Sequence, residues 1–157
     1  MKVSQYMSQP VLSIAPKTDF HVAYELMVSR GIHHLPVVDG DKLLGIVGER
    51  DLLLAAAHFG PAVVPVEEIM RSPVVTVSAS ATIAQAARLL VLRRVGSLPV
   101  LNRHKAMVGI ITETDMFKLT AGMLHPRPAP AGSPRKSASR GATGRKKPAR
   151  KAATRKK

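Results

Sequence analysis

The order of hydrophobic and polar positions predicts a series of short strands and amphipathic helices in the first half of the chain. The segment "PVLSI" is typical of a strand, and Phe20, Ala23, Tyr24 and Met27 have the spacing of one helix face. Two short strands follow, "LPVVD" and "LLGIV", separated by the polar turn "GDK". A closing helix is expected to begin near Glu49. Together these elements form a β-α-β-β-α unit.

The second half of the chain repeats this order. Here "PVVTV" predicts the first strand, and "LPVLN" and "MVGII" flank the turn "RHK". The closing helix is expected to begin near Glu113. The residues with the spacing of a helix face are Ile83, Ala86, Ala87 and Leu90.

The two halves align with each other residue by residue. A shift of 63 places Pro10 on Pro73 and Leu35 on Leu98, and after one inserted residue a shift of 64 places Asp51 on Asp115. A single unit of this size has too small a core to be stable alone. We therefore expect an α/β (α+β) fold in which two repeats, residues 1–60 and 61–125, pack as a pseudo-two-fold pair. The segment "HFGPAVVPVEEIM" joins them.

These repeats resemble a known family. The segments "GIHHLPVVDGDKLLGIVGERD" and "VGSLPVLNRHKAMVGIITETD", preceded by "YMSQPVLSI" and "IMRSPVVTV", resemble cystathionine β-synthase (CBS) domains, whose tandem pairs are called Bateman modules. The resemblance covers roughly residues 3–120. It implies two clefts between the repeats that bind an adenosyl ligand such as AMP, ADP, ATP or S-adenosylmethionine. It also implies a regulatory sensor that acts on an unknown protein target and has no cofactor and no catalytic residues.

The resemblance further implies a flat homodimer formed through helices. The segment "VEEIM" and a stripe near the end of the fold offer apolar surface for that contact. Packing within one chain explains the stripe equally well. Its residues are Met116, Leu119, Thr120 and Met123.

Each repeat passes from a strand straight into a helix, at "GIVGERD" and "GIITETD". The unpaired N–H groups and the dipole of such a helix start favour a phosphate. Thr112 could cap the helix or donate to that phosphate, and Asp115 offers two oxygens to the vicinal hydroxyls of a ribose. The resemblance assigns this role to the Asp of the family's Gly-apolar-apolar-Ser/Thr-x-x-Asp motif. Helix capping alone also accounts for both residues.

The other wall of each cleft is expected from "HHLPV" and "GSLPV". A Pro at the start of a strand removes one ladder donor, which keeps nearby backbone groups free for the edge of a base. The resemblance places adenine here, against Val95 and Leu98, although core packing also explains such apolar positions. The expected nucleotide-binding residues are therefore Gly48, Arg50, Asp51, Thr112, Thr114 and Asp115 at the corners, and His34, Leu35, Pro36, Ser97, Leu98 and Pro99 at the strand starts.

The two corners differ in sequence. Gly48 stands where the family motif has Ser or Thr, and Arg50 stands where the second repeat has Thr114. Arg50 could clamp a phosphate bidentately, or pair with a neighbouring acid or solvent. We expect the cleft that holds Asp51 to favour the more highly phosphorylated ligand. His34 is explained by a ligand contact or by ordinary packing.

Other chemistry finds little support. The chain has no Cys, and it contains no Gly-x-Ser-x-Gly, His-Glu-x-x-His or Walker A motif. His33 and His34 with Asp39 and Asp41 suggest a metal site, but adjacent residues of a strand point to opposite faces. We therefore expect no enzyme and no metal site. No stretch has the length of a membrane span, and the N-terminus lacks the apolar core of a signal peptide. A cytoplasmic protein is expected.

The charge of the chain lies in its last 32 residues. Residues 1–125 hold 12 Lys and Arg against all 10 acids, a net charge of +2, whereas residues 126–157 hold 12 and no acid. This tail has no aromatic or branched aliphatic residue, so it is expected to be disordered. It resembles, by composition only, the tails of linker histones and histone-like bacterial proteins.

Dense Lys and Arg of this kind suit binding to phosphate backbones without base readout. Anionic membranes, RNA, polyphosphate and simple solubility are the alternatives. An association with the nucleoid would follow from DNA binding, and an architectural nucleic-acid-binding protein that uses its CBS pair only to dimerise is the second hypothesis. A subunit of an enzyme complex is a third. The residues expected to bind nucleic acid are Arg145, Lys146, Lys147, Arg150, Lys151, Arg155, Lys156 and Lys157.

Overall fold

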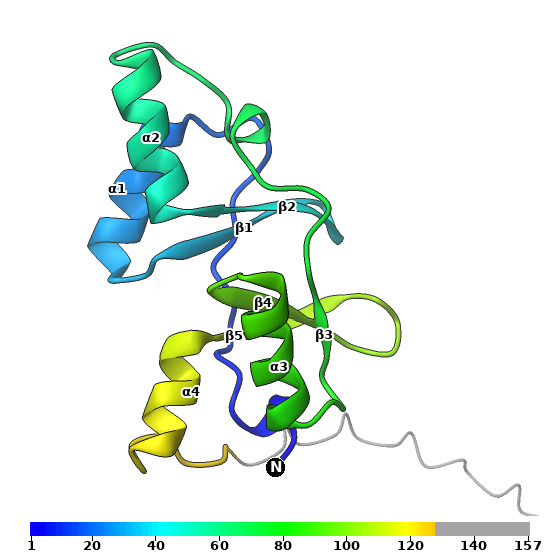
Figure 1. The fold of residues 1–157 in the computed structure, drawn as a ribbon. Coiled ribbons are helices and arrows are strands. Elements are labelled where there is room, and N and C mark those ends of the chain that lie inside the picture. The colour runs from blue at the N-terminus through cyan, green and yellow to red at the C-terminus, as the bar shows by residue number, and fades with distance from the viewer. Residues whose placement is uncertain (128–157) are drawn as a thin grey trace, which may run out of the picture.

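The computed structural model describes residues 1–127, and they form two similar halves stacked on each other (Figure 1). Each half holds a small sheet and two helices, which confirms the predicted two-repeat α/β fold. The first half contains α1 (Phe20–Arg30), β1 (His34–Asp39), β2 (Lys42–Gly48) and α2 (Glu49–Phe59). The second contains β3 (Val77–Ser78), α3 (Ile83–Arg93), β4 (Ser97–Leu101), β5 (Met107–Thr112) and α4 (Glu113–Thr120).

Both sheets are built around an antiparallel hairpin. Strand β1 pairs with β2, and β4 pairs with β5 while β3 runs parallel to β4. The first strand of each repeat is shorter than the sequence predicted. "PVLSI" contributes only a bridge from Ile14 to Val37, and "PVVTV" contributes only its last residue to β3. The residues before these points leave the sheets, and some of them line the clefts described below.

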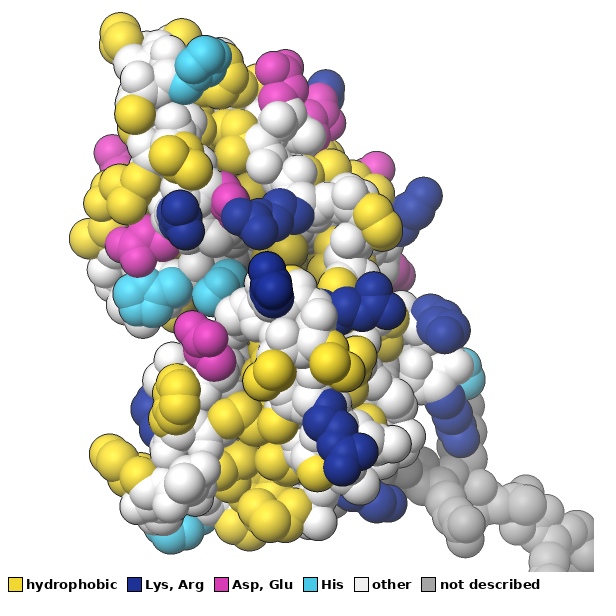
Figure 2. Space-filling view, viewed as in Figure 1, with side chains coloured by type: hydrophobic (Ala, Val, Ile, Leu, Met, Phe, Trp, Pro, Cys, Tyr) yellow, Lys and Arg dark blue, Asp and Glu magenta, His cyan; other side chains and the backbone are white. Residues whose placement is uncertain are grey.

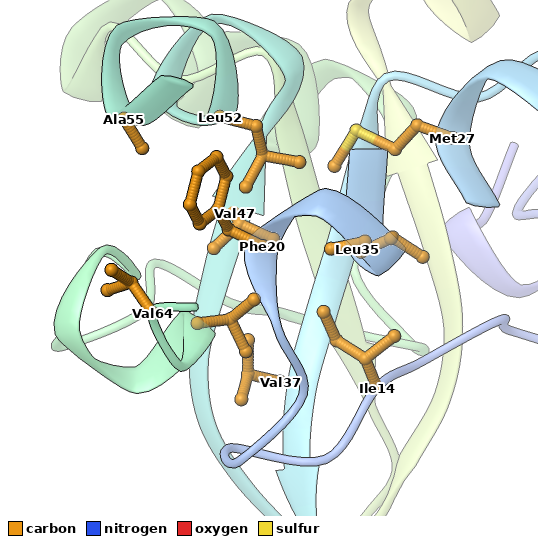
Figure 3. Packing of buried hydrophobic residues seen from close by; sticks show 11 residues of the cluster. Ile14, Phe20, Met27, Leu35, Val37, Val47, Leu52, Ala55 and Val64 are labelled. Atoms are coloured by element: carbon orange, nitrogen blue, oxygen red, sulfur yellow. The ribbon is translucent and has the colours of Figure 1, made fainter. Parts of the chain in front are cut away.

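The hydrophobic core is divided into two clusters, one for each half. Figure 3 shows the first cluster, in which side chains from α1, α2, β1 and β2 converge. Phe20 and Leu52, from the two helices, are each 1 % exposed, and Leu35 is fully buried. The second cluster has the same plan around Ala86, Leu98 and other buried residues. Burial of these apolar faces drives the packing of each helix pair on its sheet.

Each core is completed by a segment that precedes the other repeat. We call residues 2–12 and 65–75 the crossover segments. Val3 is fully buried in the second core, and Val66 is fully buried in the first. Backbone pairing continues this exchange, because Ser8 bridges Ile110 of β5, and Arg71 bridges Ile46 of β2. The walls between the halves therefore combine residues from both repeats.

The helices begin and end where local chemistry requires it. The Asp19 carboxylate accepts a hydrogen bond from the His21 backbone N–H at the start of α1, and Thr82 and Gln85 form a capping box at α3. Helix α1 ends at Gly31 with φ of 61°, a conformation that glycine adopts freely. Helix α3 ends at Arg94 with φ of 52°, where a side chain makes that conformation unfavourable.

Candidate functional site

Two clefts lie between the halves, and they are related by the repeat. Cleft I, of about 550 Å³, is lined by the β2–α2 corner, the crossover segment at 71–75, the end of α3 and the start of β4. Cleft II consists of two adjoining pockets of about 360 and 340 Å³. It is lined by the β5–α4 corner, the crossover segment at 8–12, the end of α1 and the start of β1. These volumes are typical of small-molecule sites.

The expected site residues divide between the clefts. Gly48, Arg50, Asp51 and Ser97 line cleft I, and Thr112, Thr114 and Asp115 line cleft II. His34 lines both clefts. The remaining expected residues line neither cleft and are buried within β1 and β4. They are Leu35, Pro36, Leu98 and Pro99.

The corner of cleft II is held together by Thr112 and Asp115. Asp115 Oδ2 accepts hydrogen bonds from the Thr112 backbone N–H at 2.8 Å and from its hydroxyl at 2.9 Å. The Asp115 N–H in turn donates to Thr112 Oγ1 at 3.3 Å. Both residues thus cap α4, as the simpler interpretation required. Asp115 Oδ1 accepts no hydrogen bond within residues 1–127, which leaves it available to a ligand hydroxyl.

Some of the backbone donors that the sequence suggested for a phosphate are already used. The Glu113 N–H donates to the Gly96 carbonyl at 3.0 Å, and the equivalent Glu49 N–H donates to the His33 carbonyl at 3.0 Å. Together with the Asp115 N–H, these bonds reduce what the helix starts alone can offer an anion. Side chains around the clefts therefore have a larger part in holding any charged group.

The corner of cleft I has a different arrangement, because Asp51 is bound by an arginine. Arg71 donates through Nε to Asp51 Oδ1 at 3.1 Å and Oδ2 at 3.2 Å, and through Nη2 to Oδ1 at 2.6 Å. The Gly48 N–H also donates to Asp51 Oδ2, at 3.1 Å. The hydrogen bonds to Asp51, and then its charge, raise the pKa of Arg71. Both oxygens of Asp51 are thus engaged.

The middle of the molecule holds two histidines and two glutamates. His33 Nδ1 lies 2.7 Å from Glu49 Oε2. His34 forms part of the wall between the clefts, and a Cβ at Gly96 would lie 3.0 Å from its ring. Burial lowers the pKa of His34, an effect that the nearby Glu113 charge opposes. His34 is therefore mainly neutral near pH 7.

The basic residues of the two clefts differ in number and position. Arg50, Arg71 and Arg94 line cleft I, whereas the equivalent positions of cleft II carry Thr114, Ser8 and Gly31. Cleft II is lined instead by Arg30 and Lys118, away from those positions. Figure 2 shows Lys and Arg side chains gathered at the waist between the two halves, with His and acidic side chains beside them.

Sequence reasoning identified Arg50 but missed Arg71 and Arg94. The alignment of the two repeats could have identified them, because Arg71 aligns with Ser8 and Arg94 aligns with Gly31.

The expected dimer stripe is divided by the fold. Met116 and Leu119 pack against the second core, so the alternative of packing within one chain holds for them. Met123 is 72 % exposed, and Phe117, outside the expected stripe, is 71 % exposed. The exposed apolar surface of α4 itself is thus carried by Phe117, and Met123 of the expected stripe is exposed just beyond the helix.

The remaining expectations concern the tail, metals and membranes. The basic residues expected to bind nucleic acid, from Arg145 to Lys157, lie outside the described residues. Within residues 1–127 no group of three or more His, Cys, Asp or Glu is arranged to hold a metal ion. Within the same range no helix combines the length and apolarity needed to cross a bilayer.

Comparisons with known proteins follow the repeat. The family model described as "CBS domain" matches residues 3–58 and again 66–122. A CBS domain-containing protein of Dictyostelium discoideum is 34 % identical over 138 residues, which cover 80 % of this chain and 95 % of that protein. Other curated relatives are longer, so that the chain spans between 21 % and 62 % of their length.

Solved structures have the same fold. The CBS domain pair of protein MJ0100, in complex with 5′-methylthioadenosine and S-adenosyl-L-methionine, matches with a TM-score of 0.72 and 27 % identity. The match covers 78 % of this chain and 97 % of that one. The structure of CBSX2 in complex with AMP matches with a TM-score of 0.66 and 26 % identity, over 78 % and 97 % of the two chains.

Proposed function

Because this chain belongs to the CBS-domain family and consists of a pair of CBS domains, we propose that it binds adenosyl ligands in clefts I and II and acts as a regulatory sensor. CBS-domain pairs are generally regulatory rather than catalytic, although several longer relatives are enzymes. The ligand class is an adenine nucleotide or S-adenosylmethionine. The target that responds to ligand binding is a separate protein.

One observation carries this proposal. Each cleft has an aspartate in the first turn of a helix, at equivalent positions of the two repeats, and a wall from the other repeat opposite it. A carboxylate in that position accepts hydrogen bonds from the two hydroxyls of a ribose. Similar CBS pairs have been solved with AMP and with S-adenosyl-L-methionine. Val74, Val75 and Val95 add apolar surface for a base in cleft I.

The test is calorimetry of the full chain with AMP, ADP, ATP and S-adenosylmethionine, repeated with Asp115→Ala. Loss of a hydrogen bond to a charged group should weaken binding in cleft II by about 1.5–3 kcal/mol. Because Asp115 also caps α4, the variant should unfold at a lower temperature, so thermal denaturation is measured in parallel. An intact variant with unchanged affinity would leave Asp115 with its capping role only.

Self-association belongs to the same proposal. Exposed apolar side chains on α2 and α4, among them Leu53, Leu54 and Phe117, offer surface for a homodimer formed through helices. We expect a dimer at micromolar concentration by light scattering, and Phe117→Ser should shift it towards monomer. A monomer with and without nucleotide would contradict this assembly.

A second candidate function rests on the charge of the tail. Residues 126–157 carry 12 positive charges and no acid, which favours binding to a polyanion such as DNA. The tail would then tether a nucleotide sensor to nucleic acid. In the alternative, the protein is architectural and uses the CBS pair only as a dimerisation body. Removal of the tail distinguishes these two hypotheses. A sensor without its tail still binds nucleotide, whereas an architectural protein without its tail does not.

A further inference from the structure

The starting point is the aspartate of cleft I, which already has a cationic partner. Arg71 donates three hydrogen bonds of 2.6 to 3.2 Å to the Asp51 carboxylate. The Asp51 side chain is only 15 % exposed, whereas Arg71 is 65 % exposed. Asp51 is thus mostly buried in the corner, and Arg71 reaches it from the crossover segment. The arginine is the more exposed member of this pair, so it is the one that a ligand can displace.

Among residues 1–127, cleft II has no equivalent of this ion pair. The position of Arg71 is taken by Ser8, which lines cleft II. The partner of Asp115 is Thr112 on its own corner, which uses only Oδ2. A ribose can therefore approach Asp115 without displacing a charged group. The two aspartates have the same place in the repeat but differ in what a ligand must do to reach them.

A ribose on Asp51 changes the surroundings of Arg71. Its hydroxyls need carboxylate oxygens that Arg71 now holds, so the guanidinium loses part of its hydrogen bonding. Leaving a charged group poorly paired is unfavourable. A phosphate on the same ligand restores the balance, because arginine binds phosphate bidentately as well as it binds carboxylate. Arg50 and Arg94 line the same cleft and add positive charge.

A ligand without an anionic group gains none of this. A neutral nucleoside such as 5′-methylthioadenosine would leave Arg71 without an anionic partner, whereas S-adenosylmethionine brings a carboxylate but also a sulfonium charge among three arginines. Glu49 and Glu113 also line cleft I, but within residues 1–127 the only carboxylate that Arg71 binds is that of Asp51, and the Glu49 carboxylate lies 2.7 Å from His33 Nδ1. Asp51 is therefore the partner that Arg71 exchanges for a phosphate.

We propose that Arg71 is a specificity-determining residue, which restricts cleft I to adenosyl ligands that carry an anionic group such as phosphate, whereas cleft II also accepts neutral ones. This inference rests on the proposed adenosyl-binding function. It extends that function by naming a residue outside the strand-to-helix corner and by assigning different ligand classes to the two clefts. The selectivity arises from an ion pair that only a ligand with an anionic group can replace.

The experiment compares ADP with 5′-methylthioadenosine, a neutral adenosyl ligand, by calorimetry of the full chain. The variant is Arg71→Ser, which gives cleft I the residue that cleft II has. Arg103→Ser is the matched control, since it removes an exposed arginine that lines neither cleft. Asp115→Ala is added to each of these proteins because it weakens binding in cleft II, so that the remaining heat reports on cleft I. The tail is the same in all proteins, so differences between them belong to the cleft.

In the wild-type chain we expect 5′-methylthioadenosine to fill one cleft and ADP to fill both. In Arg71→Ser the affinity of cleft I for ADP should fall at least about tenfold, and 5′-methylthioadenosine should fill both clefts. Arg71→Lys keeps the charge without the planar guanidinium, so its affinity for ADP in cleft I should lie between those of the wild type and Arg71→Ser. Equal discrimination by wild type, Arg71→Ser and Arg103→Ser would overturn the inference while leaving the proposed function intact. Absence of heat with either ligand in the wild type would overturn both.

Discussion

At the scale of single residues, three arginines distinguish the two clefts. Arg50, Arg71 and Arg94 each replace a small residue of the other repeat. The sequence was sufficient to predict the aspartates and Arg50, because they belong to one short corner. Arg71 could not be assigned to Asp51 from the sequence, since the two residues lie 20 positions apart, with most of helix α2 between them. Only the exchange of crossover segments brings the two together.

Arg94 provides a prediction at this scale. Its left-handed φ of 52° costs a side-chain-bearing residue about 1–2 kcal/mol, and the first repeat has Gly31 in its place. Arg94→Gly removes that strain but makes the unfolded chain more flexible by about 0.4–1 kcal/mol. We therefore expect the free energy of unfolding, measured by urea denaturation, to rise by about 0–1 kcal/mol, while the affinity of cleft I for ADP falls several-fold.

Arg94→Ala is the matched variant, because it removes the charge and keeps the strain. Its affinity for ADP should fall as in Arg94→Gly, without the gain in stability. A lower stability of Arg94→Gly than of Arg94→Ala would show that the strain at position 94 is smaller than the cost of glycine in the unfolded chain. Unchanged affinity in both would exclude Arg94 from the ligand site.

At the scale of elements, the crossover segments decide where the clefts lie. Helix and hairpin positions were predictable because their hydrophobic periods are local, and α2 and α4 begin at Glu49 and Glu113 as predicted. The destination of Val3 and Val66 was not predictable, since an apolar residue can be buried in either core. The crossover segments also explain why the first strand of each repeat is shorter than predicted. Its early residues leave the sheet to reach the other half of the molecule.

Two close contacts hold the crossover segments in place. Strand β5 has Gly109 under Met7, and β2 has Gly45 under Met70, so that an added Cβ would lie 2.3 Å from the sulfur in each case. Gly109→Ala should lower the free energy of unfolding by about 1–3 kcal/mol through overpacking. The change is measured by urea denaturation. Gly45→Ala should have the same effect in the first half.

A double-mutant cycle identifies the cause. In a Met7→Ala background the clashes with the sulfur and Cγ are removed and only the Cβ of residue 7 remains close, at 3.2 Å, so Gly109→Ala should cost clearly less than it does in the wild type. Additive costs would mean that Gly109 is required for a reason other than its contact with Met7.

Where the cost comes from overpacking against Met7, cleft II should keep its shape in the Gly109→Ala variant, with unchanged affinity for AMP.

At the scale of the whole molecule, a nearly neutral body is joined to a strongly basic tail. Residue Arg127 marks the junction, because its N–H donates to the Gln5 carbonyl at 2.7 Å and its side chain to the Met7 carbonyl at 3.3 Å. Leu124 packs against the second core. A truncation that preserves the body should therefore end after Arg127. It removes 11 positive charges and leaves residues 1–127 at +3.

The full chain should bind duplex DNA with little sequence preference and strong salt dependence. If about six to ten tail charges contact phosphates, affinity should fall by ~10³–10⁵ between 50 and 200 mM salt. The chain ending at Arg127 should lose nearly all of this binding, because its net charge is only +3. A dimer would present two tails and gain avidity where both reach one duplex. The measurement is a salt titration with fluorescent duplex, using both proteins with and without ADP. Salt-insensitive binding, or equal binding by the truncated chain, would mean that the tail serves a target other than a nucleic-acid backbone.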